Sequence, residues 1–250
     1  MSNIGSKLQE VKRRMASACT VAGRKAEILT RIPAAPAALA ELLFPGPVDV
    51  LALPAVSKTF PAEAVREAHA AGQQAFGENY VQEALAKIEA LADLREQLQW
   101  HLIGPLQSNK TRAVAEAFDW VHSVDRLKVA QRLSEQRPPA LPPLQVCLQV
   151  NISSEASKSG FMPDDVVAAA RAVAALPRLQ LRGLMAIPEP AADFQAQRLP
   201  HRALRALLAG LNAQGLQLDT LSMGMSADLE AAVAEGASLV RVGTAIFGQR

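Results

Sequence analysis

The sequence predicts one α/β domain folded as a closed barrel of eight parallel strands, a (β/α)₈ barrel. Three observations predict this fold. The chain has 250 residues, the usual length of one such barrel. Half of the residues are hydrophobic but only 4% are aromatic, as expected where Ala-, Leu- and Val-rich strands pack under helices. From residue 48 onward, strand-like runs alternate with helix-like runs, which is the sequence order of a TIM-type barrel.

Eight strand-like runs can be placed along the chain, and helix signals separate them. Pro61 begins one helix and Gly72 ends it, Pro163 opens another, and Gly236 closes the helix before the last strand. The eighth run is followed almost at once by Arg250, so no eighth outer helix is predicted. The predicted strands are residues 48–57, 74–78, 99–103, 120–124, 144–152, 180–187, 219–224 and 238–243.

The N-terminal part of the chain differs from this repeat. Apolar residues recur at intervals of three and four from Ile4 to Ala22, which predicts an amphipathic helix over residues 6–29 that covers the sheet near its closure. A Pro/Ala-rich insert at 31–47 precedes the first strand. Pro54 interrupts that strand, because proline cannot donate to a ladder, and predicts a bulge or a later start. We expect residues 1–250 to form a single domain, with the helix in 1–30.

Composition restricts the partners and the compartment. The 26 basic and 24 acidic side chains nearly cancel, so neither nucleic acid nor a membrane surface is expected as the main partner. Cys19 and Cys147 lie far apart in predicted helix and strand interiors, which predicts reduced thiols. The chain shows no membrane-spanning run and no signal peptide, so we expect a cytoplasmic protein. Without a second domain, we also expect a monomer.

Strand periodicity indicates which side chains face the barrel interior. In LQVCLQVNI the apolar residues alternate with polar ones, so Asn151 should point inward near the carboxyl end of its strand. Val240 and Val242 should face the helices, which places Arg241 inside the barrel, where a guanidinium needs a partner. The first strand ends at Lys58. The carboxyl ends of the strands form the ligand face of such barrels, so Lys58 is the first candidate for chemistry.

Two further strand ends suit a phosphate group. Ser226 precedes ADLEAAV as a predicted helix N-cap, and Gly243 and Thr244 follow the eighth strand. Each feature alone is common, and a lysine at a strand end is usually only solvated. Together, on the loops after strands seven and eight, they match the recurrent phosphate site of barrels. An amine opposite that site is well placed to form a Schiff base with a phosphorylated aldehyde.

Histidines do not indicate a metal site. His101 and His122 lie on successive predicted strands, but the sequence shows no clear third ligand and no metal-binding spacing. We expect these two side chains to form hydrogen bonds inside the barrel. His69 and His201 fall on predicted helices, and we expect both at the surface.

Eight ordered motifs, from residue 48 to the C-terminus, resemble those of the pyridoxal phosphate homeostasis proteins, the YggS/PROSC family. These motifs are AVSKTFP, FGENYVQE, WHLIGPLQSNK, HSVD, VNISSEASKSGF, LRGLMAI, MGMSADLEAAVAEGAS and VRVGTAIFG. The resemblance implies a barrel like the N-terminal domain of alanine racemase, with pyridoxal 5'-phosphate (PLP) held as an internal aldimine on Lys58. Pro54 and the insert depart from the family pattern. The resemblance assigns the other cofactor-binding positions to Asn79, Met225, Ser226, Arg241, Gly243 and Thr244.

The residues favour a carrier over a catalyst. If Arg241 faces the ring nitrogen of PLP, protonation of that nitrogen is disfavoured and carbanion chemistry is weakened. Racemisation needs two bases, and the single tyrosine, Tyr80, lies at a predicted helix start. We therefore expect no catalytic residues and a protein that stores PLP and delivers it to apo PLP-dependent enzymes. The alternatives are a weak PLP-dependent racemase or decarboxylase and a Schiff-base aldolase, and Lys110 or Lys158 is left open as a second loading site.

Overall fold

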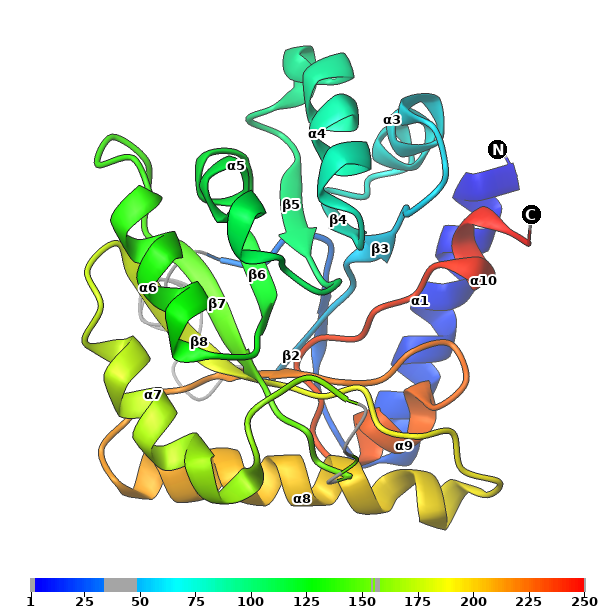
Figure 1. Ribbon diagram of the computed structural model, residues 1–250. Coiled ribbons are helices and arrows are strands. Elements are labelled where there is room, and N and C mark those ends of the chain that lie inside the picture. Colours follow the sequence, from blue (N-terminus) through cyan, green and yellow to red (C-terminus); the bar gives the residue numbers. More distant parts are fainter. Residues whose placement is uncertain (1–2, 34–48, 154, 156–157, 250) are drawn as a thin grey trace.

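The computed structural model describes residues 3–33, 49–153, 155 and 158–249. Seven parallel strands, β3 to β9, lie side by side in chain order in one sheet, and β1 pairs with β2 in a second, two-stranded sheet (Figure 1). The strands are β1 Glu27–Leu29, β2 Val50–Ala52, β3 Ala55–Val56, β4 Ala75–Glu78, β5 Gln99–Leu102, β6 Trp120–Val124, β7 Leu144–Gln149, β8 Leu179–Met185 and β9 Thr220–Ser222.

The sheet closes on itself through the segment predicted as the eighth strand. Leu239 forms isolated parallel bridges with Ser222 of β9 and with Ala52 of β2, and Val242 forms one with Ala55 of β3. Isolated bridges, rather than a regular ladder, thus join the last strand to the first. The predicted α/β barrel is confirmed, with an irregular eighth position.

The first strand of the barrel is interrupted at the expected place. Residues 48–57 were predicted as one strand, but β2 ends at Ala52 and β3 starts at Ala55, with Leu53 and Pro54 between them. The Leu53 N–H still donates to the Leu29 carbonyl at 3.1 Å. Because Pro54 has no N–H, the ladder resumes only after it.

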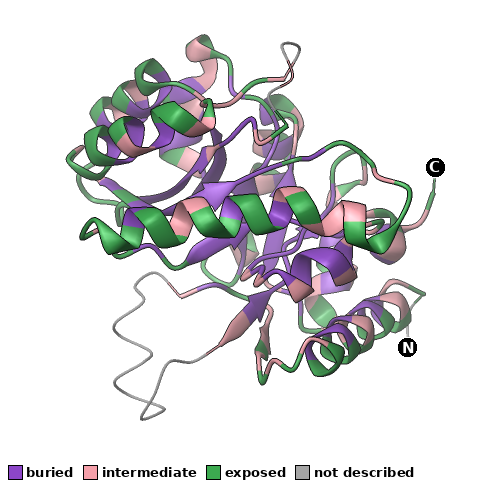
Figure 2. Cartoon of the chain, turned by 90° about the horizontal axis from the view of Figure 1, so that it is seen from below, coloured by how far each residue is buried: buried purple, intermediate pink, exposed green. Residues whose placement is uncertain are grey.

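Helices cover the outside of the sheet, and α8 crosses one side of the molecule with its buried residues facing the barrel (Figures 1 and 2). Helix α8 begins after Asp193, whose side chain accepts a hydrogen bond from the Ala196 N–H at 2.9 Å. The helices are α1 Asn3–Val21, α3 Ala62–Ala70, α4 Val81–Ala90, α5 Thr111–Ala117, α6 Leu127–Gln136, α7 Val166–Ala174, α8 Phe194–Ala213, α9 Leu229–Ala234 and α10 Thr244–Phe247.

The N-terminal helix is shorter than predicted. Helix α1 ends at Val21, and Gly23 turns the chain with a φ of 69°, so the helix predicted over 6–29 is wrong beyond residue 21. Residues Glu27–Leu29 instead pair with β2, which satisfies the backbone groups of both segments. Helix α1 packs against α3, α9 and α10 near the closure, as expected, although the short helix α10 was not predicted. Most of the insert predicted at 31–47 lies outside the described residues.

The hydrophobic core has two layers. The larger layer lies between the sheet and the helices and extends along the described chain from Leu8 to Phe247. The smaller layer fills the barrel interior, where Trp120, Cys147 and Met185 pack together. In the part of the chain that the structure describes, no helix combines the length and the apolar character that a membrane crossing requires.

Candidate functional site

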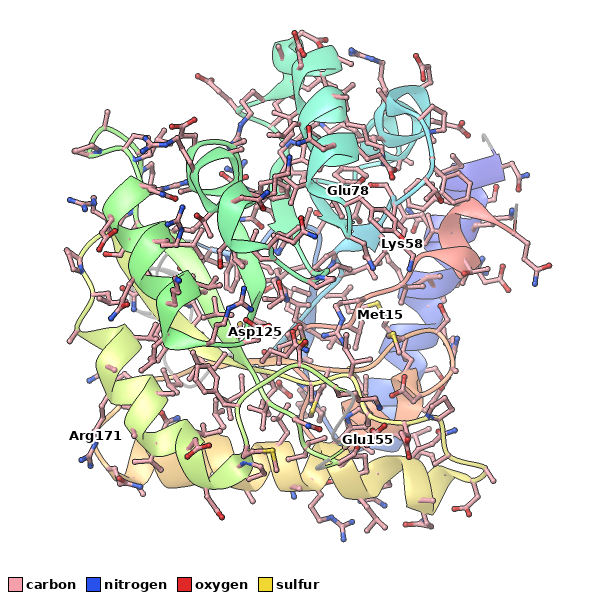
Figure 3. The ribbon with its side chains drawn as sticks, viewed as in Figure 1. Met15, Lys58, Glu78, Asp125, Glu155 and Arg171 are labelled. Atoms are coloured by element: carbon pink, nitrogen blue, oxygen red, sulfur yellow. The ribbon has the colours of Figure 1, made fainter. Side chains whose placement is uncertain are left out.

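A cavity of about 590 Å³ opens at the carboxyl ends of the first and last strands. Figure 3 labels Lys58, which follows β3 on this side of the barrel. Two of the described lining residues, Lys58 and Arg241, are cations, and none is acidic. The described lining comprises Val56, Lys58, Thr59, Phe60, Asn79, Ile103, Ile187, Met225, Ser226, Ala227, Arg241, Gly243, Thr244, Gly248 and Gln249.

All seven positions that the sequence assigned to one site line this cavity. They come from the segments after β3, β4 and β9, from the closing segment and from the first residue of α10. The structure thus brings together residues separated by as much as 186 positions, from 58 to 244. These residues are Lys58, Asn79, Met225, Ser226, Arg241, Gly243 and Thr244.

Ser226 is not the helix cap that the sequence predicted. Helix α9 begins at Leu229 with Asp228 as its N-cap residue, and Ser226 lies in the turn before it. Asp228 accepts the N–H of Met225 at 2.7 Å and a bond from His201 at 2.9 Å. Because Asp228 organises this turn, the Ser226 side chain does not serve as the cap and lies at the cavity wall.

Arg241 points into the barrel, as strand parity predicted, and is 4% exposed. Its guanidinium donates to the Ser222 carbonyl at 2.7 Å, to the Ser222 hydroxyl at 2.6 Å and to the Ala186 carbonyl at 3.0 Å. Burial lowers the pKa of Arg241 to about 10, so the side chain remains a cation at neutral pH. Its described hydrogen-bond partners are neutral groups rather than a carboxylate, and the charge of Asp228 acts on it without a described hydrogen bond between the two.

Lys58 lies in a tight turn over residues 57–60. The Phe60 N–H donates to the Ser57 carbonyl at 3.0 Å, and Thr59 has a φ of 68°. A positive φ at the third residue is typical of a type II turn, where glycine is usual and a β-branched residue is strained. The Lys58 side chain is exposed and lies at the cavity wall.

A buried ionic network lies beside this turn, and the sequence analysis missed it. The Lys87 ammonium donates to the Ser57 carbonyl, to Glu78 and to Glu83, each at 2.7 Å. The Ser57 hydroxyl donates to Glu78 at 2.6 Å, and the Thr59 N–H donates to Glu83. Burial raises the pKa of Glu78, although Lys87 and Ser57 oppose this. The available signal was the i,i+4 pair Glu83 and Lys87, with Lys87 on the buried face of α4.

The interior histidines form hydrogen bonds, as predicted. His101 Nδ1 lies 3.0 Å from His122 Nε2, and His122 Nδ1 lies 2.7 Å from the hydroxyl of Ser222, which also binds Arg241. Burial lowers the pKa of His101 to about 3 and that of His122 well below its usual value. Within the described residues no cluster of His, Cys, Asp or Glu could hold a metal ion.

Two other predictions meet different outcomes. Asn151 is buried, as predicted, and its amide is bonded to the backbone of Glu155 and Lys158, so it organises the loop after β7. His201 was predicted at the surface, but this is wrong. Its side chain, on α8, is fully buried and bonded to Asp228, because one face of α8 packs on α9.

Comparison with known proteins shows similarity over most of the chain. The family model of the alanine racemase N-terminal domain matches residues 52–250. The pyridoxal phosphate homeostasis protein of Pseudomonas aeruginosa is 58% identical over 100% of this chain and 97% of its own length. The protein of the same name from Escherichia coli strain K12 is 48% identical over 100% of this chain and 98% of its own length.

Solved structures agree with these matches. The structure of PipY from Synechococcus elongatus PCC7942 with PLP bound superimposes with a TM-score of 0.73 at 43% identity, over 85% of this chain and 97% of that chain. An alanine racemase from Clostridium difficile 630 superimposes with a TM-score of 0.65 at 14% identity, over 85% of this chain and 55% of that chain. The second likeness concerns the fold alone.

Proposed function

The chain belongs to the alanine racemase N-terminal domain family and to the pyridoxal phosphate homeostasis proteins within it, and from that premise we propose that it binds PLP through Lys58, stores it and delivers it. One observation carries the proposal. A cavity lined by Lys58 and Arg241, with no acidic residue among its described lining, suits an anionic aldehyde.

The described residues fit PLP in size and chemistry. A cavity of about 590 Å³ lies within the usual range for small-ligand sites. Ser226 and Thr244 would supply hydroxyls for a phosphate. The side-chain oxygen of Asn79 is buried and has no hydrogen-bond partner among the described residues, which suits a ligand donor at the cavity wall. Met225 and Gly243 complete the proposed lining.

Lys58 supplies the amine of the proposed covalent link. When bound, PLP would supply an aldehyde, and the Lys58 amine would be the group that condenses with it, with release of water. Arg241, held by Ser222 and Ala186, would present a cation to the ring nitrogen and keep that nitrogen unprotonated. The electron-withdrawing power of the ring is then reduced, which favours storage over amino-acid chemistry.

Delivery is the second part of the proposal. Hydrolysis of the link returns the Lys58 amine and free PLP, so an apo PLP-dependent enzyme could accept the ligand without a permanent complex. A cytoplasmic monomer is consistent with this role, and the relative PipY has a structure with PLP bound.

Borohydride reduction followed by peptide mass mapping tests the proposal. The PLP-loaded protein should be yellow and should carry one reduced pyridoxyl group on the peptide that contains Lys58. Lys58→Ala should abolish the label, whereas Lys110→Ala and Lys158→Ala serve as matched lysine controls and should retain it. A label on another lysine would reject the assignment. Amino-acid turnover by the pure protein that disappears in Lys58→Ala would reject the carrier role.

A further inference from the structure

The turn that carries Lys58 is held from outside the cavity by helix α4. The Ser57 carbonyl, which precedes Lys58, accepts the Lys87 ammonium at 2.7 Å. The Thr59 N–H, which follows Lys58, donates to the Glu83 carboxylate. Lys87 and Glu83 are themselves paired at 2.7 Å. One ion pair on α4 therefore fixes the backbone on both sides of Lys58.

The turn needs such a restraint because Thr59 is a β-branched residue at a φ of 68°. This backbone conformation is rare for threonine and persists where surrounding contacts determine it. The Glu83 carboxylate accepts the N–H of this same residue, so the bond acts directly on the strained position. The second anchor is deeply buried, since Lys87 is 5% exposed and Glu78 is 0% exposed.

Lys87 does not compete with Lys58 as the reactive amine. Its three N–H groups are directed to three acceptors, namely the Ser57 carbonyl, Glu78 and Glu83. Lys87 is also not among the described residues that line the cavity, whereas Lys58 is. The geometry leaves Lys87 as an anchor and Lys58 as the group at the cavity.

We propose that Glu83 and Lys87 are positioning residues that hold the Ser57–Phe60 turn so that the Lys58 amine meets the aldehyde in the cavity. The inference rests on the proposed function for the identity of the ligand. The restraint on the turn is a property of the protein without ligand. The two can therefore be measured separately.

The first experiment measures amide hydrogen exchange in the ligand-free protein. Glu83→Ala removes the acceptor of the Thr59 N–H and retains a good helix former at a partly exposed position. Glu89→Ala removes a carboxylate from an exposed position of the same helix and is the matched control. We expect exchange at the Thr59 amide to accelerate at least about tenfold in Glu83→Ala and to stay unchanged in Glu89→Ala.

The second experiment measures covalent loading by PLP titration and borohydride trapping. Glu83→Ala should weaken loading of Lys58 about tenfold, the effect of losing one hydrogen bond to a charged group. Binding of PLP measured without borohydride should change less, because the Glu83→Ala substitution leaves Arg241 and Thr244 in place. Adding Thr59→Gly to Glu83→Ala should restore much of the loading, since glycine adopts a positive φ without strain. The exchange rate at residue 59 should stay fast in this double variant.

The outcomes separate the two proposals. An unchanged exchange rate at the Thr59 amide in Glu83→Ala would overturn the proposal that α4 holds the turn. PLP loading of Lys58 at the wild-type level in that variant would overturn it as well. Failure of Thr59→Gly to recover loading would show that the α4 contacts do not act through the strained turn, which also overturns the inference. Failure of the wild-type protein to load Lys58 would instead refute the proposed function, while the exchange measurement would still decide whether α4 holds the turn.

Discussion

Protonation of the two interior histidines should destabilise the protein as the pH falls from 7.5 to 5.5. Both imidazoles are fully buried. Burial holds the pKa of His101 at about 3 and that of His122 well below its usual value. In the unfolded chain each would titrate near pH 6.5. The unfolded state therefore binds protons that the folded state cannot, and folding stability present above pH 6.5 is lost as the pH decreases.

The size of the effect follows from these pKa positions. Between pH 7.5 and 5.5, a histidine that titrates near 6.5 only when unfolded lowers the free energy of unfolding by about 1.4 kcal/mol. The pair His101 and His122 together should lower it by about 2.7 kcal/mol. Most carboxyl groups titrate below this window, so their contribution should be smaller.

Urea unfolding at several pH values measures this dependence. His122→Gln should lose about half of the decrease, because one proton-binding group is gone from the unfolded state. Ser222→Ala removes the hydroxyl partner of His122 but no histidine, so it should lower stability while retaining the pH dependence. A wild-type free energy of unfolding that stays constant from pH 7.5 to 5.5 would refute buried neutral histidines. Ring proton resonances of His101 that titrate near pH 6.5 in the folded protein would do the same.

Three further substitutions test other parts of the structure. Glu235→Gln should cost about 2 kcal/mol by urea unfolding, because its buried carboxylate lies among Arg198, Arg202 and Arg205. The loss should be greater at low salt, and a salt-independent loss would contradict it. Gly183→Ala should cost at least about 3 kcal/mol, since a Cβ would lie 1.8 Å from the Thr220 carbonyl oxygen in the neighbouring strand. A soluble variant with the wild-type thermal midpoint would exclude that clash. Arg241→Met should leave Ser222 and Ala186 without their donor and weaken PLP retention in equilibrium dialysis, and undiminished retention would remove Arg241 from the site.

The sequence predicted the site well because strand ends in a parallel barrel converge on one face. Strand parity placed Arg241 in the interior, and the order of the strand ends placed Lys58 near Thr244. These positions follow from local periodicity and topology. The family resemblance added Asn79 and Met225, for which the strand pattern gave no specific role.

The errors occur where tertiary contacts override local signals. A helical pattern continued past Val21, but Gly23 and the pairing of Glu27–Leu29 with β2 ended the helix. Ser226 had a cap-like sequence context, yet α9 begins only at Leu229, with Asp228 as its N-cap residue, and the Asp228 carboxylate accepts the Met225 N–H rather than a helix N–H. The network around Lys87 had one sequence signal, the i,i+4 spacing of Glu83 and Lys87, which does not by itself predict burial. A lysine on a helix is normally solvated, and only the position of α4 beside the Ser57 carbonyl shows that this one is buried.

Arg241 connects the interior of the barrel to the character of the cavity. Its guanidinium shares Ser222 with His122, and its positive charge further lowers the pKa of that imidazole. Among the described residues its hydrogen-bond partners are neutral groups, and the carboxylate whose charge acts on it is Asp228, in the turn before α9. In the proposed complex an anionic phosphate would gain from the positive charge of Arg241, whereas a ring nitrogen facing Arg241 would be held unprotonated. On that proposal the same charge would favour the binding of PLP and weaken catalysis by it, which is the combination that a carrier requires.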